Sequence, residues 1–160
     1  MSSKQTDLFA GDLSHVWQHH NRRGRGRAAP CRKVVNISSI AGLGGNAGQT
    51  AYATARAGVV GLTRTLAKEW GRYNVTVNTV AFGLITTRLT DTAGFEHIDV
   101  AGHRIAVGLS AELRAMTEQL IPLGRPGTPQ DAARAVYLLC PPESDYASGQ
   151  TIVCGGGLEL

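Results

Sequence analysis

The chain has 160 residues, of which 42% are hydrophobic and 18% are charged. This length and composition predict one globular domain with a sizeable core and exclude a disordered chain. No apolar run approaches the roughly 20 residues of a membrane span, and residues 1–10 lack an apolar signal region. We therefore expect a cytoplasmic protein with no membrane partner.

The formal net charge of +4 is concentrated near the N-terminus, where the arginine–glycine segment 22–27 carries four arginines. Such segments can bind RNA through charge and arginine stacking. The run contains no aromatic residue, so a solvated loop is the simpler interpretation, and we do not expect nucleic acid as a partner. His15 and His19 are one helical turn apart, but no further ligand is spaced to complete a zinc site.

The cysteines are also typical of a protein from a reducing compartment such as the cytoplasm. Cys31, Cys140 and Cys154 are far apart and form no CxxC pair. We expect free thiols, with neither a disulfide nor a metal site.

Residues 1–30 show weak periodicity, with a short helix indicated over 12–21. Residues 34–38 form a β-branched apolar run that is typical of a buried parallel strand. A glycine-rich loop is expected over 42–48 and one long helix over 50–70. The apolar residues at helical spacing in that helix are Ala51, Ala55, Val59, Leu62, Leu66 and Trp70. Small residues on its other faces predict a helix packed on both sides.

A second β-rich run over 74–82 ends at Gly83, and a polar stretch follows it. A helix is expected over 110–120, with Ser110 as its N-cap.

The next helix is expected over 129–140, and its start resembles a capping box built on Thr128 and Asp131. The last strand is expected over 150–154. Strands that alternate with helices in this way indicate parallel βαβ units and an α/β fold.

Ser39, Tyr52 and Arg56 form the most informative constellation in the chain. Tyr52 follows Ser39 by thirteen residues, and Arg56 follows Tyr52 by four. Tyr52 and Arg56 therefore share one helix face, and Ser39 ends the strand expected beside it. A tyrosine with its ordinary pKa of about 10 needs a nearby cation to act as an acid or base at neutral pH.

Five stretches carry a family resemblance that runs from Val34 to Leu158. They are VVNISSIAG, YATARAGVVGLTRTLAKEW, VTVNTVAFGLITTRL, IPLGRPGTPQDAARAVYLLC and SGQTIVCGGG. In order and spacing they resemble the C-terminal half of the short-chain dehydrogenase/reductase family, most like its 3-oxoacyl-(acyl-carrier-protein) reductases. The resemblance implies a partial Rossmann-like parallel sheet of three strands with flanking helices over residues 31–160. It leaves 1–30 as a poorly matched N-terminal segment, for which disorder is one interpretation.

The resemblance also implies roles for the three residues, with Ser39, Tyr52 and Arg56 as catalytic residues. In the family the tyrosine exchanges the reacting proton, the serine holds the substrate oxygen, and a lysine one turn after the tyrosine binds the nicotinamide ribose. Arg56 stands in the lysine position. It keeps the positive charge but replaces a compact ammonium with a wide planar fork, so we predict weakened catalysis.

The loop after the second strand resembles the family's cofactor loop. Phe82 stands where the family usually has proline, Gly83 follows it, and the positions of Ile85 and Thr87 contact the nicotinamide cofactor in the family. With Tyr52 and Arg56, these residues are the implied binding site for NADP(H) or NAD(H). The glycine-rich loop 42–48 corresponds to the substrate mouth and not to a phosphate cradle.

The implied function is an NAD(P)(H)-dependent oxidoreductase that interconverts a carbonyl and a secondary alcohol on a small-molecule carbonyl or acyl thioester substrate. Nothing before Val34 matches the family's first βαβ unit, so we expect a truncated, alternatively initiated or frame-disrupted product with an open strand edge. We expect a homo-oligomer, or a hetero-oligomer with a full-length relative. The alternative is a catalytically inactive fragment that associates with a full-length family member.

Overall fold

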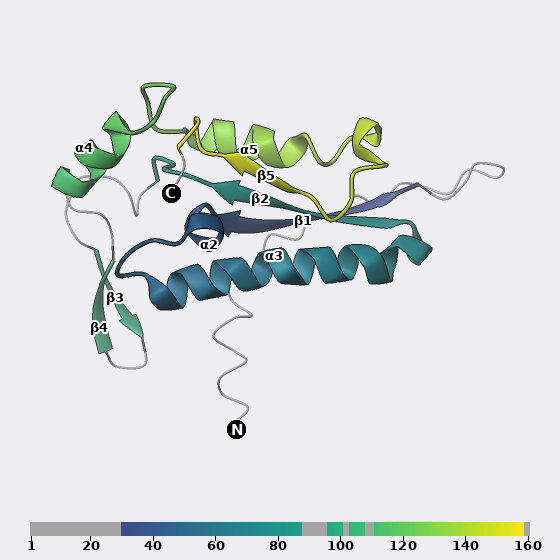
Figure 1. The fold of residues 1–160 in the computed structure, drawn as a ribbon, viewed down its shortest axis with the longest axis horizontal. Coiled ribbons are helices and arrows are strands. Elements are labelled where there is room, and N and C mark those ends of the chain that lie inside the picture. The colour runs from purple at the N-terminus through teal and green to yellow at the C-terminus, as the bar shows by residue number, and fades with distance from the viewer. Residues whose placement is uncertain (1–29, 88–95, 101–102, 108–110, 159–160) are drawn as a thin grey trace.

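The computed structural model describes residues 30–87, 96–100, 103–107 and 111–158 (Figure 1). The helix predicted over 12–21, the arginine–glycine segment and the paired histidines lie outside these residues. None of the described helices is both long and apolar enough to cross a bilayer.

Three parallel strands form the sheet that organises the molecule, in the order β1-β2-β5. They are β1 (Arg32–Ser39), β2 (Val75–Phe82) and β5 (Thr151–Cys154). Ser39 lies opposite Phe82 in the register, and Phe82 lies opposite Cys154, so the carboxyl ends of all three strands are level. The expected strands and the partial Rossmann-like α/β fold are confirmed.

Two helices cover opposite faces of this sheet (Figure 1). They are α3 (Thr50–Trp70), which packs on β1 and β2, and α5 (Pro129–Tyr137), which packs on β2 and β5. The central strand β2 is buried along six of its eight residues, because both helices and both neighbouring strands contact it.

The face between the sheet and α5 is apolar. Its buried residues are Val35, Val80, Ala135 and Leu139, and the half-buried Phe82, Val136, Cys140, Ile152 and Cys154 pack against them. The three cysteines are free thiols, as expected. Burial raises the pKa of the Cys140 and Cys154 thiols, which keeps them protonated and unreactive at neutral pH.

The face between the sheet and α3 is polar in its interior. Asn36 Nδ2 donates to Thr63 Oγ1 at 2.9 Å, and the Thr63 hydroxyl also contacts Thr79 Oγ1. All three side chains are buried. A buried polar group needs such partners to offset its loss of water, so this network fixes α3 on the two strands.

The buried face of α3 differs from the one that the apolar spacing predicts. Val60 and Thr63 are its buried residues, whereas Leu62 is 41% exposed and Trp70 is also exposed. Among the described elements, α3 packs mainly on β1, β2 and α2 (Ala41–Gly44). Ala55, Val59 and Leu66 of the apolar pattern are half-buried, so the pattern identifies part of the contact face and misses the threonine at its centre.

Short elements complete the described chain. They are α2 (Ala41–Gly44), η2 (Gly71–Tyr73), β3 (Glu96–Val100), β4 (His103–Val107), α4 (Ala111–Gln119) and η3 (Pro142–Ser144). α2 overlaps the first part of the glycine-rich loop expected over 42–48, and α4 matches the helix expected over 110–120. The antiparallel hairpin of β3 and β4 was not predicted, because two five-residue strands give too short an alternation to identify.

A second, smaller apolar core packs at the carboxyl ends of the strands. Its residues are Ile40, Leu84, Ile121 and Leu158. The Ile40 N–H donates to the Phe82 carbonyl at 3.0 Å, and the Gly83 N–H donates to the Cys154 carbonyl at 3.0 Å. A Cβ on Gly83 would lie 2.8 Å from Gly155 Cα, so glycine permits this close approach.

Gly42 allows α2 to touch α3. A Cβ on Gly42 would lie 2.6 Å from the Arg56 carbonyl carbon and 2.7 Å from the Ala57 nitrogen. Since these are backbone atoms, we expect Gly42→Ala to lower the free energy of unfolding by about 1–3 kcal/mol, measured by urea denaturation. Gly58→Ala is the matched control, because nothing lies within 4 Å of its added Cβ, and it should stabilise the helix by about 0.5–1 kcal/mol. Equal effects at both positions would contradict this interpretation.

Lys33 is only 4% exposed at the start of β1. Its Nζ lies 2.7 Å from Asp145 Oδ1 and 3.1 Å from Ser144 Oγ, which ties the strand to the loop before β5. We expect Asp145→Ala to lower the free energy of unfolding by about 2 kcal/mol, because the buried ammonium loses its carboxylate. Adding Lys33→Met should restore most of that loss. A double variant no more stable than Asp145→Ala would argue against this role of the buried ammonium.

Candidate active site

The first turns of α3 bring Tyr52 and Arg56 together. Arg56 Cζ lies 4.9 Å from the centroid of the Tyr52 ring, in cation–π geometry. Tyr52 is 44% exposed, so its phenol is accessible to a small molecule. The sequence predicted a shared helix face, and the structure adds that the guanidinium stacks on the ring.

Ser39 ends β1, and its strand is fastened to the same helix. Ser39 Oγ accepts a hydrogen bond from the Ala41 N–H at 3.2 Å. The neighbouring Ser38 Oγ donates to the Arg56 carbonyl at 2.8 Å. The relative placement of Ser39 and of the Tyr52 helix turn is therefore held by a direct contact between strand and helix.

The predicted cofactor loop follows β2 and is held in place by pairing with a distant segment. Ile85 forms a parallel bridge with Gly127, the Thr86 N–H donates to the Gly127 carbonyl at 2.8 Å, and the Gly127 N–H donates to the Leu84 carbonyl at 2.9 Å. Thr87 is exposed. In open parallel sheets, ligands bind beyond the carboxyl ends of the strands, where this loop and Ser39 both lie.

The donor groups at this end of the sheet fit one half of a nicotinamide cofactor. A serine hydroxyl, an exposed phenol and a guanidinium can bind the hydroxyl and carbonyl oxygens of a ribose and of a small substrate. The described residues include no group of three or more His, Cys, Asp or Glu that could hold a metal ion.

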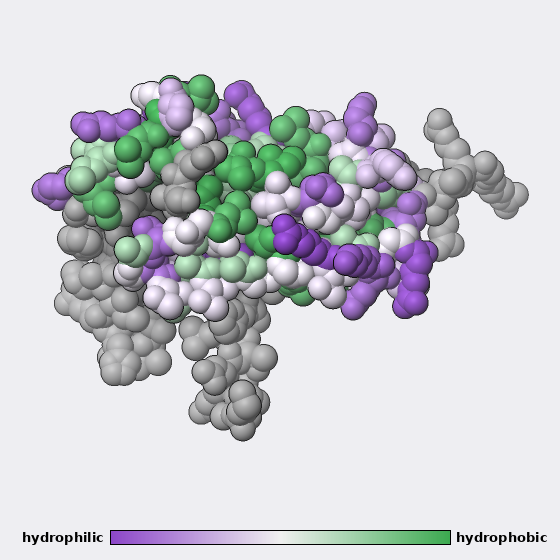
Figure 2. Space-filling model, in the orientation of Figure 1, coloured by the Kyte–Doolittle hydropathy of each residue, from purple (hydrophilic) through white to green (hydrophobic). Residues whose placement is uncertain are grey.

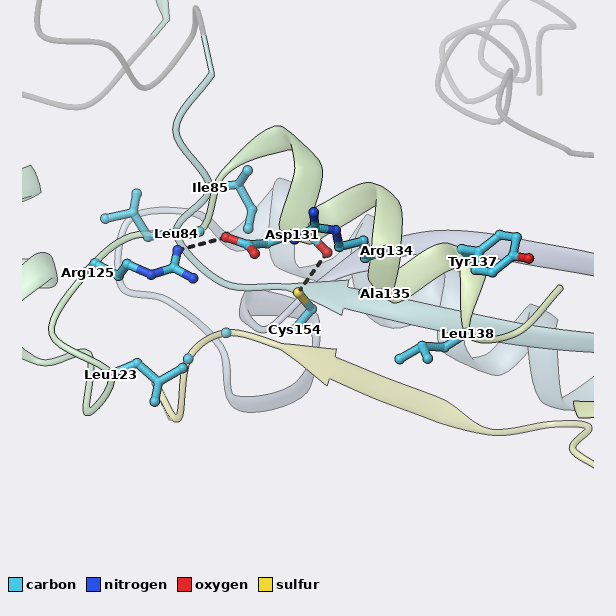
Figure 3. Close-up of a pocket in the computed structure, with 13 residues that line it drawn as sticks. Leu84, Ile85, Leu123, Arg125, Asp131, Arg134, Ala135, Tyr137, Leu138 and Cys154 are labelled. Atoms are coloured by element: carbon cyan, nitrogen blue, oxygen red, sulfur yellow. Dashed lines mark hydrogen bonds and ion pairs between the residues drawn. The ribbon is translucent and has the colours of Figure 1, made fainter. Parts of the chain in front are cut away.

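A cleft of about 530 Å³ opens on the other face of the sheet, beside α5 (Figure 3). Its lining comes from the loop after β2, from the segment before α5, from α5 and from the end of β5; Leu84, Leu123 and Leu138 give it apolar walls, and Arg134 and Tyr137 contribute polar groups. Of the site residues predicted from sequence, only Ile85 lines it. No local pattern could have revealed this cleft, because it exists only where distant segments meet.

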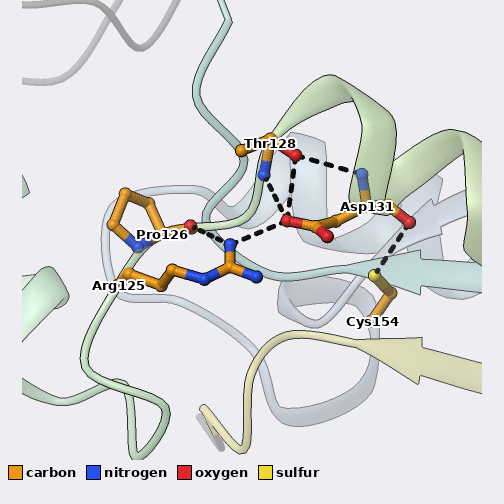
Figure 4. A network of polar contacts seen from close by, with 5 residues as sticks. All are labelled: Arg125, Pro126, Thr128, Asp131 and Cys154. Atoms are coloured by element: carbon orange, nitrogen blue, oxygen red, sulfur yellow. Dashed lines mark hydrogen bonds and ion pairs between the residues drawn. The ribbon is translucent and has the colours of Figure 1, made fainter.

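A polar network at the start of α5 includes Arg125 and Asp131, which line the cleft (Figure 4). Asp131 Oδ2 accepts from Arg125 Nη1 at 2.7 Å and from the Thr128 N–H and Oγ1 at 2.9 Å each, and Thr128 Oγ1 accepts from the Asp131 N–H at 3.1 Å. The predicted capping box is confirmed. The hydrogen bonds from Arg125 and Thr128 hold the pKa of the Asp131 carboxyl far below its usual range.

The lowered pKa of Asp131 predicts a pH-dependent contribution to stability. A carboxyl with a depressed folded-state pKa stabilises the fold above its ordinary pKa of 3.8 and loses this effect as the pH falls below it. We therefore expect the wild type to have a larger free energy of unfolding than Asp131→Asn at neutral pH. The difference should shrink as the pH falls below 3.8. Urea unfolding at a series of pH values tests this, and a pH-independent difference would contradict it.

Comparisons with known proteins agree with this architecture. The family model described as Enoyl-(Acyl carrier protein) reductase matches residues 19–159. The 3-oxoacyl-[acyl-carrier-protein] reductase FabG of Vibrio harveyi is 40% identical over 128 residues, which cover 80% of this chain and 46% of that protein.

Two further relatives have similar coverage. FabG of Thermotoga maritima is 40% identical over 79% of this chain and 45% of its own length. A (3R)-3-hydroxyacyl-CoA dehydrogenase of Canis lupus familiaris is 40% identical over 81% and 44%. The chain thus spans about half the length of the curated relatives it matches. The family model and these relatives show that the chain belongs to the short-chain dehydrogenase/reductase family, most like FabG.

Proposed function

We propose that this chain carries the substrate side of an NAD(P)(H)-dependent oxidoreductase that interconverts a carbonyl and a secondary alcohol. The observation that carries the proposal is the hydrogen bond from Ser38 Oγ to the Arg56 carbonyl, which joins the strand that ends at Ser39 to the helix turn of Tyr52 and Arg56. Family membership supports the same reaction class. The catalytic half of the domain would lie within residues 31–160.

Ser39 and Tyr52 act on the substrate oxygen in this proposal. The Ser39 hydroxyl donates to the carbonyl oxygen and orients it, and the exposed Tyr52 phenol delivers a proton to that oxygen during reduction. In the oxidative direction the phenol oxygen receives the proton from the alcohol. The bound nicotinamide supplies or takes the hydride at the adjacent carbon.

The remaining site residues support the reacting tyrosine and the cofactor. Arg56 supplies a positive charge next to the phenol, with a geometry that differs from that of the family's lysine. The backbone around Phe82 and Gly83, the backbone at Ile85 and the hydroxyl of Thr87 form the wall that faces the nicotinamide. The pairing of Ile85 with Gly127 supports this role, because a fixed wall orients a cofactor ring better than an unpaired loop.

The substrate class is proposed from the relatives. FabG proteins are named for the reduction of 3-oxoacyl groups on acyl carrier protein, and a related dehydrogenase is named for 3-hydroxyacyl-CoA. We infer a small acyl thioester or similar carbonyl substrate, with NADP(H) or NAD(H) as the cofactor, in a cytoplasmic homo-oligomer or a hetero-oligomer with a full-length relative.

A second candidate function is that of an inactive fragment that associates with a full-length family member. Among the described strands, β1 pairs only with β2, so its outer edge offers backbone groups to a further strand. The chain also spans less than half of each relative named above. The open edge of β1 favours pairing with a strand of a further polypeptide.

Tyr52→Phe discriminates between the two functions. We expect the substitution to reduce NADPH or NADH oxidation with a 3-oxoacyl thioester by at least about 100-fold, because the proton donor is lost, while the dissociation constant of the cofactor stays nearly unchanged. Absorbance assays and a fluorescence titration measure the two quantities.

Tyr146→Phe is the matched control, since Tyr146 is fully exposed and its loss should not change turnover. If the wild type neither binds the cofactor nor turns over, yet co-purifies with a full-length reductase whether or not residue 52 is substituted, the enzyme proposal fails and the fragment function stands.

A further inference from the structure

The backbone of Arg56 is fixed on two sides. Ser38 Oγ on β1 donates to its carbonyl at 2.8 Å, and Gly42 of α2 lies so close that an added Cβ would clash with the same peptide. The point from which the Arg56 side chain departs is therefore set by the sheet and not by the helix alone.

Among the contacts of the Arg56 guanidinium are a ring contact and a backbone contact that an ordinary helix-surface arginine would not combine. It stacks on the Tyr52 ring with Cζ 4.9 Å from the centroid, and its Nη1 lies 3.5 Å from the Ile37 carbonyl oxygen on β1. A planar fork with five N–H donors can lie flat on a ring and still donate in its own plane.

The Ile37 carbonyl belongs to the outer edge of β1. The N–H groups of Arg32 and Ile40 donate to the Asn74 and Phe82 carbonyls, on the β2 side. Backbone groups of alternate residues point to opposite sides of a strand, so the odd-numbered Ile37 points away from β2. Arg56 thus reaches an acceptor that the neighbouring strand β2 cannot satisfy.

We propose that Arg56 is a positioning residue that bridges the outer edge of β1 and the Tyr52 ring, and so sets the direction of the Tyr52 phenol. Its effect on turnover rests on the proposed function, whereas the bridge itself does not. A lysine at this position could place a charge near the ring but could not lie flat on it and donate to Ile37 at the same time. The planar side chain thus gives arginine a role at this position that a lysine could not fill.

The test follows the tyrosine ring directly. The chain has four tyrosines, so a sample with ¹³C-labelled tyrosine gives few aromatic signals, and Tyr52→Phe assigns the relevant one. In Arg56→Met we expect the Tyr52 signal to shift and to lose its nuclear Overhauser contact with residue 56, and kcat to fall about 10- to 100-fold with an unchanged cofactor dissociation constant. In Arg56→Lys we expect a smaller shift and an intermediate kcat.

Arg72→Met is the matched control, because Arg72 Cζ lies 4.7 Å from the Tyr73 ring in η2, just after α3. It should move the Tyr73 signal and leave the Tyr52 signal and turnover unchanged. Unchanged signals of Tyr137 and Tyr146 in all variants show that the fold is intact.

Three results would overturn the proposal. The first is a Tyr52 signal that does not respond to Arg56→Met. The second is an Arg56→Lys variant whose Tyr52 signal and kcat equal those of the wild type. The third is a cofactor dissociation constant that rises in Arg56→Met while kcat is unchanged, because that would make Arg56 a direct cofactor ligand. If the wild type neither binds nor oxidises NADPH or NADH, the proposed function fails, but a Tyr52 signal that shifts in Arg56→Met still supports the bridge.

Discussion

The close approach of α3 to the carboxyl end of β1 is the constraint on which the rest of the site depends. Gly42 allows α2 to touch the helix backbone at Arg56, and Ser38 donates a hydrogen bond to the same peptide. The buried network of Asn36, Thr63 and Thr79 holds the middle of the helix on the sheet. Together these contacts fix the register between strand and helix, and the register decides whether a serine on one can work with a tyrosine on the other.

The two faces of the sheet have different physical characters. The α5 face is an apolar core with free, protonated thiols and an adjacent cleft, and its helix start is fixed by an ionised carboxylate (Figures 3 and 4). The α3 face is joined by hydrogen bonds and carries the proposed chemistry. Figure 2 shows that apolar surface gathers over the α4, α5 and β5 side of the molecule, where Leu120, Leu123 and Leu138 are exposed.

The chain contains the family's site residues but matches only part of its relatives' length. The matched region includes the serine, the tyrosine and the loop after β2, yet it corresponds to less than half of each relative named above. Arg56 is the clearest departure within that region. A planar guanidinium can stack on a ring and donate to a strand edge at once, whereas an ammonium acts as a point charge. Arginine in place of the family's lysine therefore keeps the positive charge but changes the contacts that can orient the tyrosine.

The sequence by itself determined the three strands, the long helix, the capping box at Thr128 and the shared face of Tyr52 and Arg56, because hydrophobic period, cap chemistry and helix spacing are local properties. The tertiary structure alone decided that Val60 and Thr63, and not Leu62 or Trp70, are buried on α3. It also revealed the cleft beside α5 and the contact between Arg56 and Ile37. These features depend on segments distant in sequence, and on buried polar pairs that no apolar pattern records, so only the packed chain could define them.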